Sequence, residues 1–356
     1  MGLESPHHPL VGRDREIEVL AGLVTDVAAG RGRSVWLEGE PGVGKSSLLA
    51  AGFAGARAAG CEVFWESADR TRQRFPLWVL LDCLRVGSRS NDPLRAGIAA
   101  LLRGEESSGL TPEDTTAVVA ERLLVLVDRL CALSPVVLVL DDLHWADEAT
   151  LAAWARLHAA VHQLPLLLVG ACRPVPGRPE LAALRENVTG PAATVTTLAP
   201  LTVDQSVDLM GTLVDAAPGP RLRHLTEQAG GNPLYLRELL DALLRDETVR
   251  VADGVAELVP AAPDQPASLS AAISRRLRFL SEPATTAVRL AALLGAEFPI
   301  EHLHLASGWA EGGLSAVVDE AVAAGVLTGA GPGRYAFRHG LIQQTLYEEI
   351  PSPVRA

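Results

Sequence analysis

Residues 39–47 read GEPGVGKSS, and Lys45 within them is the only lysine among the 31 lysine and arginine residues of the chain. The stretch follows SVWLE (34–38), which is predicted to be a buried strand, and precedes an apolar segment predicted to be helical to about Ala59. Gly-x-x-x-x-Gly-Lys-Ser between a strand and a helix is typical of a phosphate-binding loop. A compact ammonium on a flexible stem suits such a loop better than a planar guanidinium does, which explains a lone lysine in an arginine-rich chain.

Backbone N–H groups of such a loop, together with the N-terminus of the helix that follows, attract phosphate. Glycines let the backbone approach a ligand closely and adopt positive φ angles. Lys45 is expected to reach the β- and γ-phosphates, and the Ser46 hydroxyl to bind Mg²⁺. The loop residues predicted to contact the nucleotide are Gly39, Pro41, Gly42, Val43, Gly44, Lys45, Ser46 and Ser47.

Two carboxylates end the apolar run VVLVLDD (136–142). At the carboxyl end of a strand beside the loop, Asp141 can hold Mg²⁺ and Asp142 can orient or deprotonate an attacking water. Solvated aspartates at a strand end are the alternative, and the loop about 95 residues upstream favours the metal-binding interpretation. Asp147 is expected to cap the next helix rather than contact nucleotide.

Three further residues are candidates with simpler alternatives. Arg173 ends the apolar run LPLLLVGACR (164–173) and can bind the γ-phosphate, or it can be a surface arginine. Asn232 and Pro233 are expected as the N-cap and first residue of a helix. His339, judged from the residues alone, is expected to be a buried core histidine rather than a ligand.

Continuous apolar strands alternating with helices predict an α/β fold, a P-loop NTPase whose parallel sheet is covered by helices on both faces. The predicted strands are 34–38, 61–67, 136–142, 164–173 and 194–201, and a long helix is predicted over 112–133. After residue 202 the pattern is helical alone through NPLYLRELLDALLRDE (232–247), and a Pro/Ala-rich linker is predicted at 259–268. More helices and a hairpin around GPGR (331–334) then suggest a winged helix. The predicted domains are 1–200 (nucleotide-binding), 201–258 (helical lid) and 259–356 (winged helix).

The composition is that of a globular protein, with 48% hydrophobic and 21% charged residues among 356. A net charge of −12 argues against a broad nucleic-acid surface, and the segment from Pro283 onward has four arginines against seven acidic residues. Four widely spaced cysteines are expected to be free, buried thiols. No membrane span or signal peptide is recognised, so a cytoplasmic location without membrane association is expected.

These motifs together resemble a known family. In order, the segments LVGRDREIEVL, GEPGVGKSS, VLVLDDLHWAD, ACRP, GGNPLYLREL and YAFRHGLIQQTLYEEIP resemble the ATPase module of large ATP-binding LuxR-type bacterial transcription regulators. Those regulators belong to the STAND class of signal-transduction NTPases, relatives of the AAA+ ATPases. The resemblance extends over about residues 10 to 352, and it implies a P-loop domain, a helical lid and a winged-helix domain that closes over the nucleotide.

The resemblance also implies roles for single residues. Val11, Gly12 and Arg13 match the segment beside the adenine, and Pro233 matches the lid proline near the base. His339 matches the winged-helix histidine that contacts the β-phosphate of ADP in the resting state. The Walker A pair, the Walker B pair and the sensor arginine of the family match Lys45, Ser46, Asp141, Asp142 and Arg173.

The function implied is an ATP/ADP-binding regulatory switch that hydrolyses ATP slowly with Mg²⁺. Family members continue into a helical-repeat sensor and a LuxR-type DNA-binding domain, so a chain ending at Ala356 is expected to keep the switch alone, as a natural short protein or a truncated product. A regulatory partner, within the chain or another protein, and self-association in the ATP state are expected, without direct nucleic-acid binding. The alternatives are an oligomeric AAA+-like ATPase with fast turnover, a P-loop kinase, and a scaffold that holds nucleotide only for folding.

Overall fold

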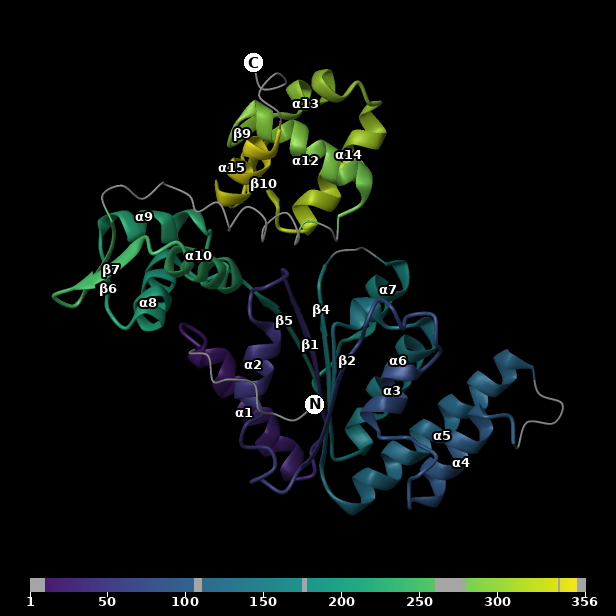
Figure 1. Cartoon of the computed structure of the whole chain (residues 1–356). Helices are drawn as coiled ribbons and strands as arrows, with labels where there is room; N and C mark the ends of the chain where they lie inside the picture. Colours follow the sequence, from purple (N-terminus) through teal and green to yellow (C-terminus); the bar gives the residue numbers. More distant parts are fainter. Residues whose placement is uncertain are drawn as a thin grey trace.

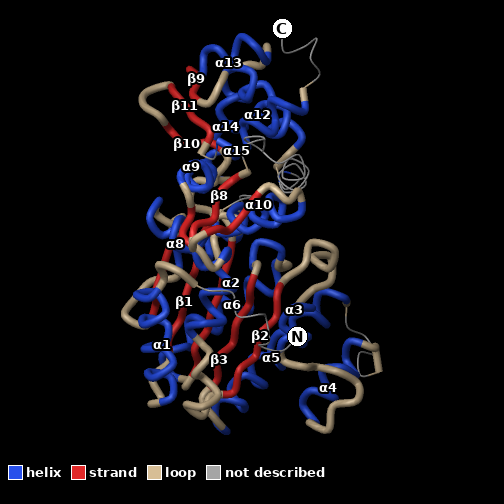
Figure 2. The backbone as a smooth tube through the Cα atoms, turned by 60° about the vertical axis from the view of Figure 1, so that its left-hand side comes forward, coloured by secondary structure: helices blue, strands red, loops and turns tan. Residues whose placement is uncertain are grey.

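A computed structural model describes residues 10–105, 111–174, 178–259, 277, 280–338 and 340–350. The chain folds into three parts. In Figure 2 the first part lies at the bottom, the second above it and the third at the top. Figure 1 shows the third part over the end of the sheet of the first part.

The first part is built on a five-stranded parallel sheet with the order β2-β3-β4-β1-β5. The strands are β1 (Arg33–Gly39), β2 (Glu62–Ser67), β3 (Val136–Asp141), β4 (Leu166–Cys172) and β5 (Ala193–Leu198). Every residue of β3 and β4 is buried, as expected for strands covered on both faces. The predicted parallel α/β sheet is therefore confirmed, and β1, which leads into the glycine loop, has a neighbour on each side.

Alternate side chains of the strands enter two separate cores. Val35 and Leu37 of β1 pack on the face covered by α1 (Asp14–Ala28) and α2 (Lys45–Gly52). Trp36 points to the opposite face, where its ring meets that of Trp154 edge-on at a centroid distance of 5.4 Å. That face is covered by α3 (Trp78–Cys83), α4 (Pro93–Leu102), α5 (Pro112–Leu133), α6 (Glu148–Ala160) and α7 (Pro179–Asn187), as Figure 1 shows.

Two helix boundaries illustrate what the local sequence decides. Helix α5 begins where predicted, because Thr111 and Asp114 form a reciprocal capping box ahead of its first turn. Helix α2 ends at Gly52, so the prediction that it continues to about Ala59 is wrong. Gly52 lies so close to Leu20 of α1 that an added Cβ would come within 2.5 Å of it, and turns follow up to Gly60.

The second part contains α8 (Val203–Val214), α9 (Pro220–Gln228) and α10 (Pro233–Arg245). The prediction of helices alone is wrong here, because a small sheet of β6 (Ala217–Pro218), β8 (Val255–Leu258) and β7 (Val249–Ala252) packs beside them. Asp253 and Gly254 turn the β7–β8 hairpin with φ of 51° and 76°. Asp-Gly is a recognised hairpin signal, so the sequence did contain the evidence for this element.

The third part contains α12 (Glu282–Leu294), α13 (Ile300–Ser307), α14 (Glu311–Ala323) and α15 (Gly340–Glu349). Its antiparallel sheet has the order β10 (Leu327–Gly329), β11 (Arg334–Phe337), β9 (Glu297–Pro299). The hairpin predicted around GPGR is the β10–β11 pair. One continuous cluster of buried apolar residues runs from the second part into the third.

Two sequence expectations concern the chain as a whole. Cys61, Cys83, Cys131 and Cys172 are free and buried, as predicted, and burial raises the pKa of the Cys172 thiol to about 12. Among the described residues, no helix combines the length and apolar character that crossing a bilayer requires.

Candidate functional site

The glycine loop joins the end of β1 to the start of α2. Gly44 has a φ of 102° and is the N-cap of α2, and no side chain of the described residues accepts a capping hydrogen bond from the first-turn N–H groups. Gly42 has a φ of 82°, and an added Cβ would lie 2.7 Å from the Cβ of Leu234 in α10. The loop is therefore shaped both for an anion and for close approach of the second part.

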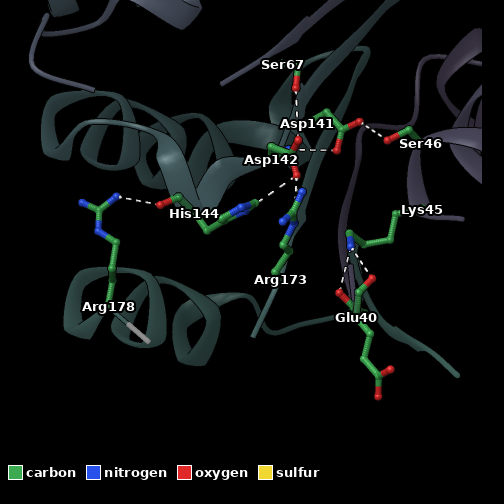
Figure 3. A network of polar contacts seen from close by, with 10 residues as sticks. Glu40, Lys45, Ser46, Ser67, Asp141, Asp142, His144, Arg173 and Arg178 are labelled. Atoms are coloured by element: carbon green, nitrogen blue, oxygen red, sulfur yellow. Dashed lines mark hydrogen bonds and ion pairs between the residues drawn. The ribbon is translucent and has the colours of Figure 1, made fainter. Parts of the chain in front are cut away.

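Lys45 lies beneath the loop and is 6% exposed. Its Nζ donates hydrogen bonds to the carbonyl oxygens of Gly39 (2.8 Å) and Glu40 (3.1 Å), as Figure 3 shows. The pKa of Lys45 is lowered to about 8, mainly by burial and also by the positive charge of Arg173, while nearby carboxylates partly offset both effects. The loop thus holds a partly desolvated ammonium whose charged form an anion would stabilise.

Ser46 and Asp141 meet at the end of β3. The Ser46 hydroxyl donates to Oδ2 of Asp141 at 2.5 Å, and Asp141 is 4% exposed. Burial raises the pKa of Asp141, and the hydrogen bond from Ser46 partly offsets that rise. A hydroxyl and a carboxylate that converge in this way supply hard oxygen ligands, which fit Mg²⁺.

Asp142 adopts a left-handed backbone conformation, with a φ of 51°, and its N–H donates to Oδ1 of Asp141 at 2.8 Å. Its carboxylate lies among three polar groups, all at long distances. Oδ2 is 3.5 Å from the Ser67 hydroxyl, and Oδ1 is 3.6 Å from Nε of Arg173 and 3.8 Å from Nδ1 of His144 (Figure 3). Aspartate is one of the few residues besides glycine that adopt this left-handed conformation readily.

A pocket of about 230 Å³ lies between the glycine loop and α10. Most of the predicted nucleotide-contacting residues line it, namely Val11, Arg13, Gly42, Val43, Gly44, Lys45, Ser46, Ser47, Asp142, Arg173 and Pro233. Gly12, Gly39 and Pro41 are not among the lining residues, although the carbonyls of Gly39 and Pro41 support the loop through hydrogen bonds from Lys45 and Asn232. His339 lies outside the described residues.

The N-terminal segment is tied to the junction between the first and second parts. Arg13 is 5% exposed, and its Nη2 donates to the carbonyl of Ala199 at 2.5 Å. Gln205 of α8 donates to the carbonyl of Gly12 at 3.4 Å. These contacts explain how residues 10–13 reach the pocket from the start of the chain.

The second part reaches the loop through the start of α10. Oδ1 of Asn232 accepts a hydrogen bond from the N–H of Leu234 at 3.1 Å, which confirms the predicted N-cap. The same side chain donates through Nδ2 to the carbonyl of Pro41 at 2.9 Å, a link that the sequence did not indicate. The predicted cap of the next helix in the first part, Asp147, is confirmed as well, because it accepts from the N–H of Thr150.

Arg237 is a pocket residue that sequence reasoning missed. It lies on α10 and lines the pocket, and its buried Nε has no hydrogen-bond partner among the described residues. Burial lowers the pKa of Arg237, and Asp241 partly offsets that effect. The signal in the sequence was its spacing, because a residue four positions after Pro233 lies on the same helical face.

The third part also contacts the loop. Arg338 donates to the carboxylate of Glu40, the second residue of GEPGVGKSS. Gly325 packs against the same carboxylate so closely that an added Cβ would lie 2.2 Å from its carbon. Sequence reasoning missed this pair, although Arg338 precedes the singled-out His339.

His144, beside the carboxylates, was also missed by sequence reasoning and is 0% exposed. Burial lowers its pKa to about 3, and the positive charges of Arg173, Lys45 and Arg178 act in the same direction, so the imidazole is neutral at physiological pH. Arg178 donates from Nη1 to the carbonyls of His144 (3.3 Å) and Ala146 (2.5 Å).

Comparison with known proteins agrees with this geometry. Residues 9–169 match the family model described as an AAA ATPase domain. These residues form an ATPase module of the P-loop NTPase type. Residues 204–257, in the second part, match a domain of unknown function (DUF8739).

Longer alignments extend beyond the ATPase module. An uncharacterized protein of Rhizobium meliloti (strain 1021) is 25% identical over 393 residues, which cover 96% of this chain and 35% of that protein. The chain thus spans about a third of the length of this relative. The Walker-type ATPase of Pyrococcus abyssi superposes with a TM-score of 0.63 at 15% identity, over 96% of this chain and 97% of that one. The ORC2 protein of Aeropyrum pernix, in ADPNP–ADP complexes, superposes with a TM-score of 0.57 at 14% identity, over 99% and 98% of the two chains.

Proposed function

We propose that the chain is an ATP/ADP-binding regulatory switch that hydrolyses ATP slowly with Mg²⁺. The observation that carries this proposal is the position of the pocket between two parts of the chain. The loop around Lys45 forms one wall, and Pro233, Leu234 and Arg237 of α10 form the other. A ligand that contacts both walls can favour one arrangement of the two parts over another. The free energy by which it does so equals the difference in its affinity for the two arrangements.

The proposed roles follow from the chemistry of each side chain. Lys45 and Arg173 bind the phosphates, and Ser46 and Asp141 hold Mg²⁺ through their converging oxygens. Bound Mg²⁺ supplies positive charge that neutralises the phosphate oxygens. Asp142 orients the attacking water and accepts its proton, since its carboxylate lines the pocket and has no close hydrogen-bond donor among the described side chains.

The base-binding end of the pocket is proposed to take adenine. Its apolar lining comes from three places in the chain, with Val11 from the N-terminal segment, Leu209 from α8 and Pro233 from α10. An aromatic base gains most of its binding energy from apolar contact with such surfaces. Discrimination between adenine and guanine rests on the sequence resemblance.

The second part acts as the helical lid and the third as a winged helix that closes on the loop. The ion pair of Arg338 with Glu40 supports this assignment, because it joins the third part directly to the phosphate-binding segment. His339, the next residue, is proposed to contact the β-phosphate of ADP. The order of the sequence motifs supports placing the switch in a LuxR-type transcription regulator in the cytoplasm, under control of a further part of that regulator or of another protein.

The test is to identify the nucleotide that copurifies with the protein. The chain is purified, denatured and analysed by chromatography beside Lys45→Ala, which removes the ammonium beneath the loop. Near-stoichiometric ADP in the wild type, absent from the variant, is the expected result. A wild type that is empty and hydrolyses ATP rapidly, faster at higher protein concentration, would replace the switch with an oligomeric AAA+-like ATPase.

A further inference from the structure

His144 is a buried polar side chain that the proposed chemistry leaves without a role. It lies in the short helix η1 (Leu143–Trp145), two residues after Asp142, and is 0% exposed. Neither Nδ1 nor Nε2 has a hydrogen-bond partner within the part of the chain that is described. Buried polar groups in folded proteins nearly always have partners, so an unpaired imidazole beside a functional carboxylate requires an explanation.

The imidazole is held in place by its surroundings. Arg178 donates to the carbonyls of His144 and Ala146, which fixes the backbone of the short helix. The ring lies against that of Trp145, the next residue, at a centroid distance of 4.9 Å. Leu143, the preceding residue, is fully buried. The side chain therefore has little freedom to move toward a partner.

The Asp142 carboxylate, by contrast, is loosely held. Its contacts with Ser67, Arg173 and His144 are 3.5, 3.6 and 3.8 Å, all longer than a normal hydrogen bond. Figure 3 shows the imidazole directed at this carboxylate. A small movement of the carboxylate would bring Oδ1 within hydrogen-bonding distance of Nδ1.

We propose that His144 is a positioning residue, whose Nδ1–H donates to the Asp142 carboxylate and sets the orientation in which Asp142 acts on the attacking water. This role rests on the proposed ATPase function. A donor held at a fixed position suits this role, because a hydrogen bond sets the direction in which the carboxylate points.

The test compares two substitutions of nearly equal size. His144→Asn keeps an N–H donor at about the place of Nδ1, whereas His144→Leu has the same branching and no donor. His144→Leu is expected to lower kcat for ATP hydrolysis about tenfold or more, the loss typical of one hydrogen bond to a charged group. KM and the Kd for ADP are expected to stay within about twofold, and His144→Asn to retain most of kcat, because the role concerns the reacting water and not nucleotide binding.

A structural role would give a different pattern. Thermal unfolding of both variants reports core damage, and His144→Met, a flexible apolar replacement without a donor, takes the place of the leucine variant if that one does not fold. In an Asp142→Asn background, His144→Leu is expected to cause no further loss of kcat, since its partner is already changed.

The outcomes separate this role from the function on which it rests. A wild type that hydrolyses no ATP beyond the Lys45→Ala background overturns both. A wild type that hydrolyses ATP, with equal kcat values in the asparagine and apolar variants, overturns only the role of His144.

Discussion

The buried ammonium of Lys45 makes nucleotide affinity depend on pH. Its pKa is lowered to about 8 in the structure, so the free protein loses this charge as the pH rises through 8. Bound phosphate favours the charged form and raises the pKa in the complex. Binding above pH 8 therefore takes up a proton, and Kd rises with pH. With a pKa of about 8, Kd is expected to increase about 25-fold from pH 7.5 to 9.5, equivalent to about 2 kcal/mol.

Calorimetric titration with ADP in the presence of a chelator measures this dependence without contributions from a metal ion. Two buffers with different ionisation enthalpies give the number of protons taken up, which should approach one at pH 9. Lys45→Arg is the matched control, because a guanidinium keeps its charge throughout and should bind more weakly but with a flat pH profile. A flat profile in the wild type, or the same slope in the arginine variant, would refute the assignment of the proton to Lys45.

Three further predictions concern close backbone packing, the pocket and the contact of the third part with the glycine loop. Gly231→Ala should destabilise the protein by about 2 kcal/mol or more in thermal unfolding, because φ is +76° and the new Cβ would lie 2.1 Å from a backbone oxygen. Gly312→Ala is the control and should be neutral or stabilising in this assay, because a Cβ there would meet no described atom within 4 Å. Arg237→Gln should raise Kd for ATP about tenfold in a fluorescence titration, and an unchanged Kd would place that side chain away from the nucleotide. Arg338→Glu should lower stability by about 1 kcal/mol in chemical unfolding, and adding Glu40→Arg should restore it; additive losses would contradict a direct pairing.

The sequence predicted the first part well because its signals are local. A strand buried on both faces is a continuous apolar run, so β1, β3 and β4 could be recognised from their own residues. The order of the strands could not be recognised in this way, because it depends on which crossover helices pack on which face. The close approach of Gly52 in α2 to Leu20 in α1 likewise depends on how two helices pack.

The site residues also fall into those that local sequence specifies and those that only packing brings together. Lys45, Ser46 and Asp141 belong to motifs in which neighbouring residues specify the geometry. Arg237 and Arg338 lie about 190 and 300 residues beyond the loop in sequence, and they reach it through the packing of separate parts. No short sequence motif could have predicted these contacts. His144 stands inside a quoted motif, yet only the structure shows that its ring is enclosed and directed at a carboxylate.

The position of β1 in the sheet has a consequence for the order in which the protein is made. β1 pairs with β4 on one side and with β5 on the other, and β5 ends at Leu198. While the chain is being synthesised, the strand that supports the glycine loop leaves the ribosome more than a hundred residues before either partner. The sheet around the glycine loop can therefore be completed only after residues far along the chain have been synthesised.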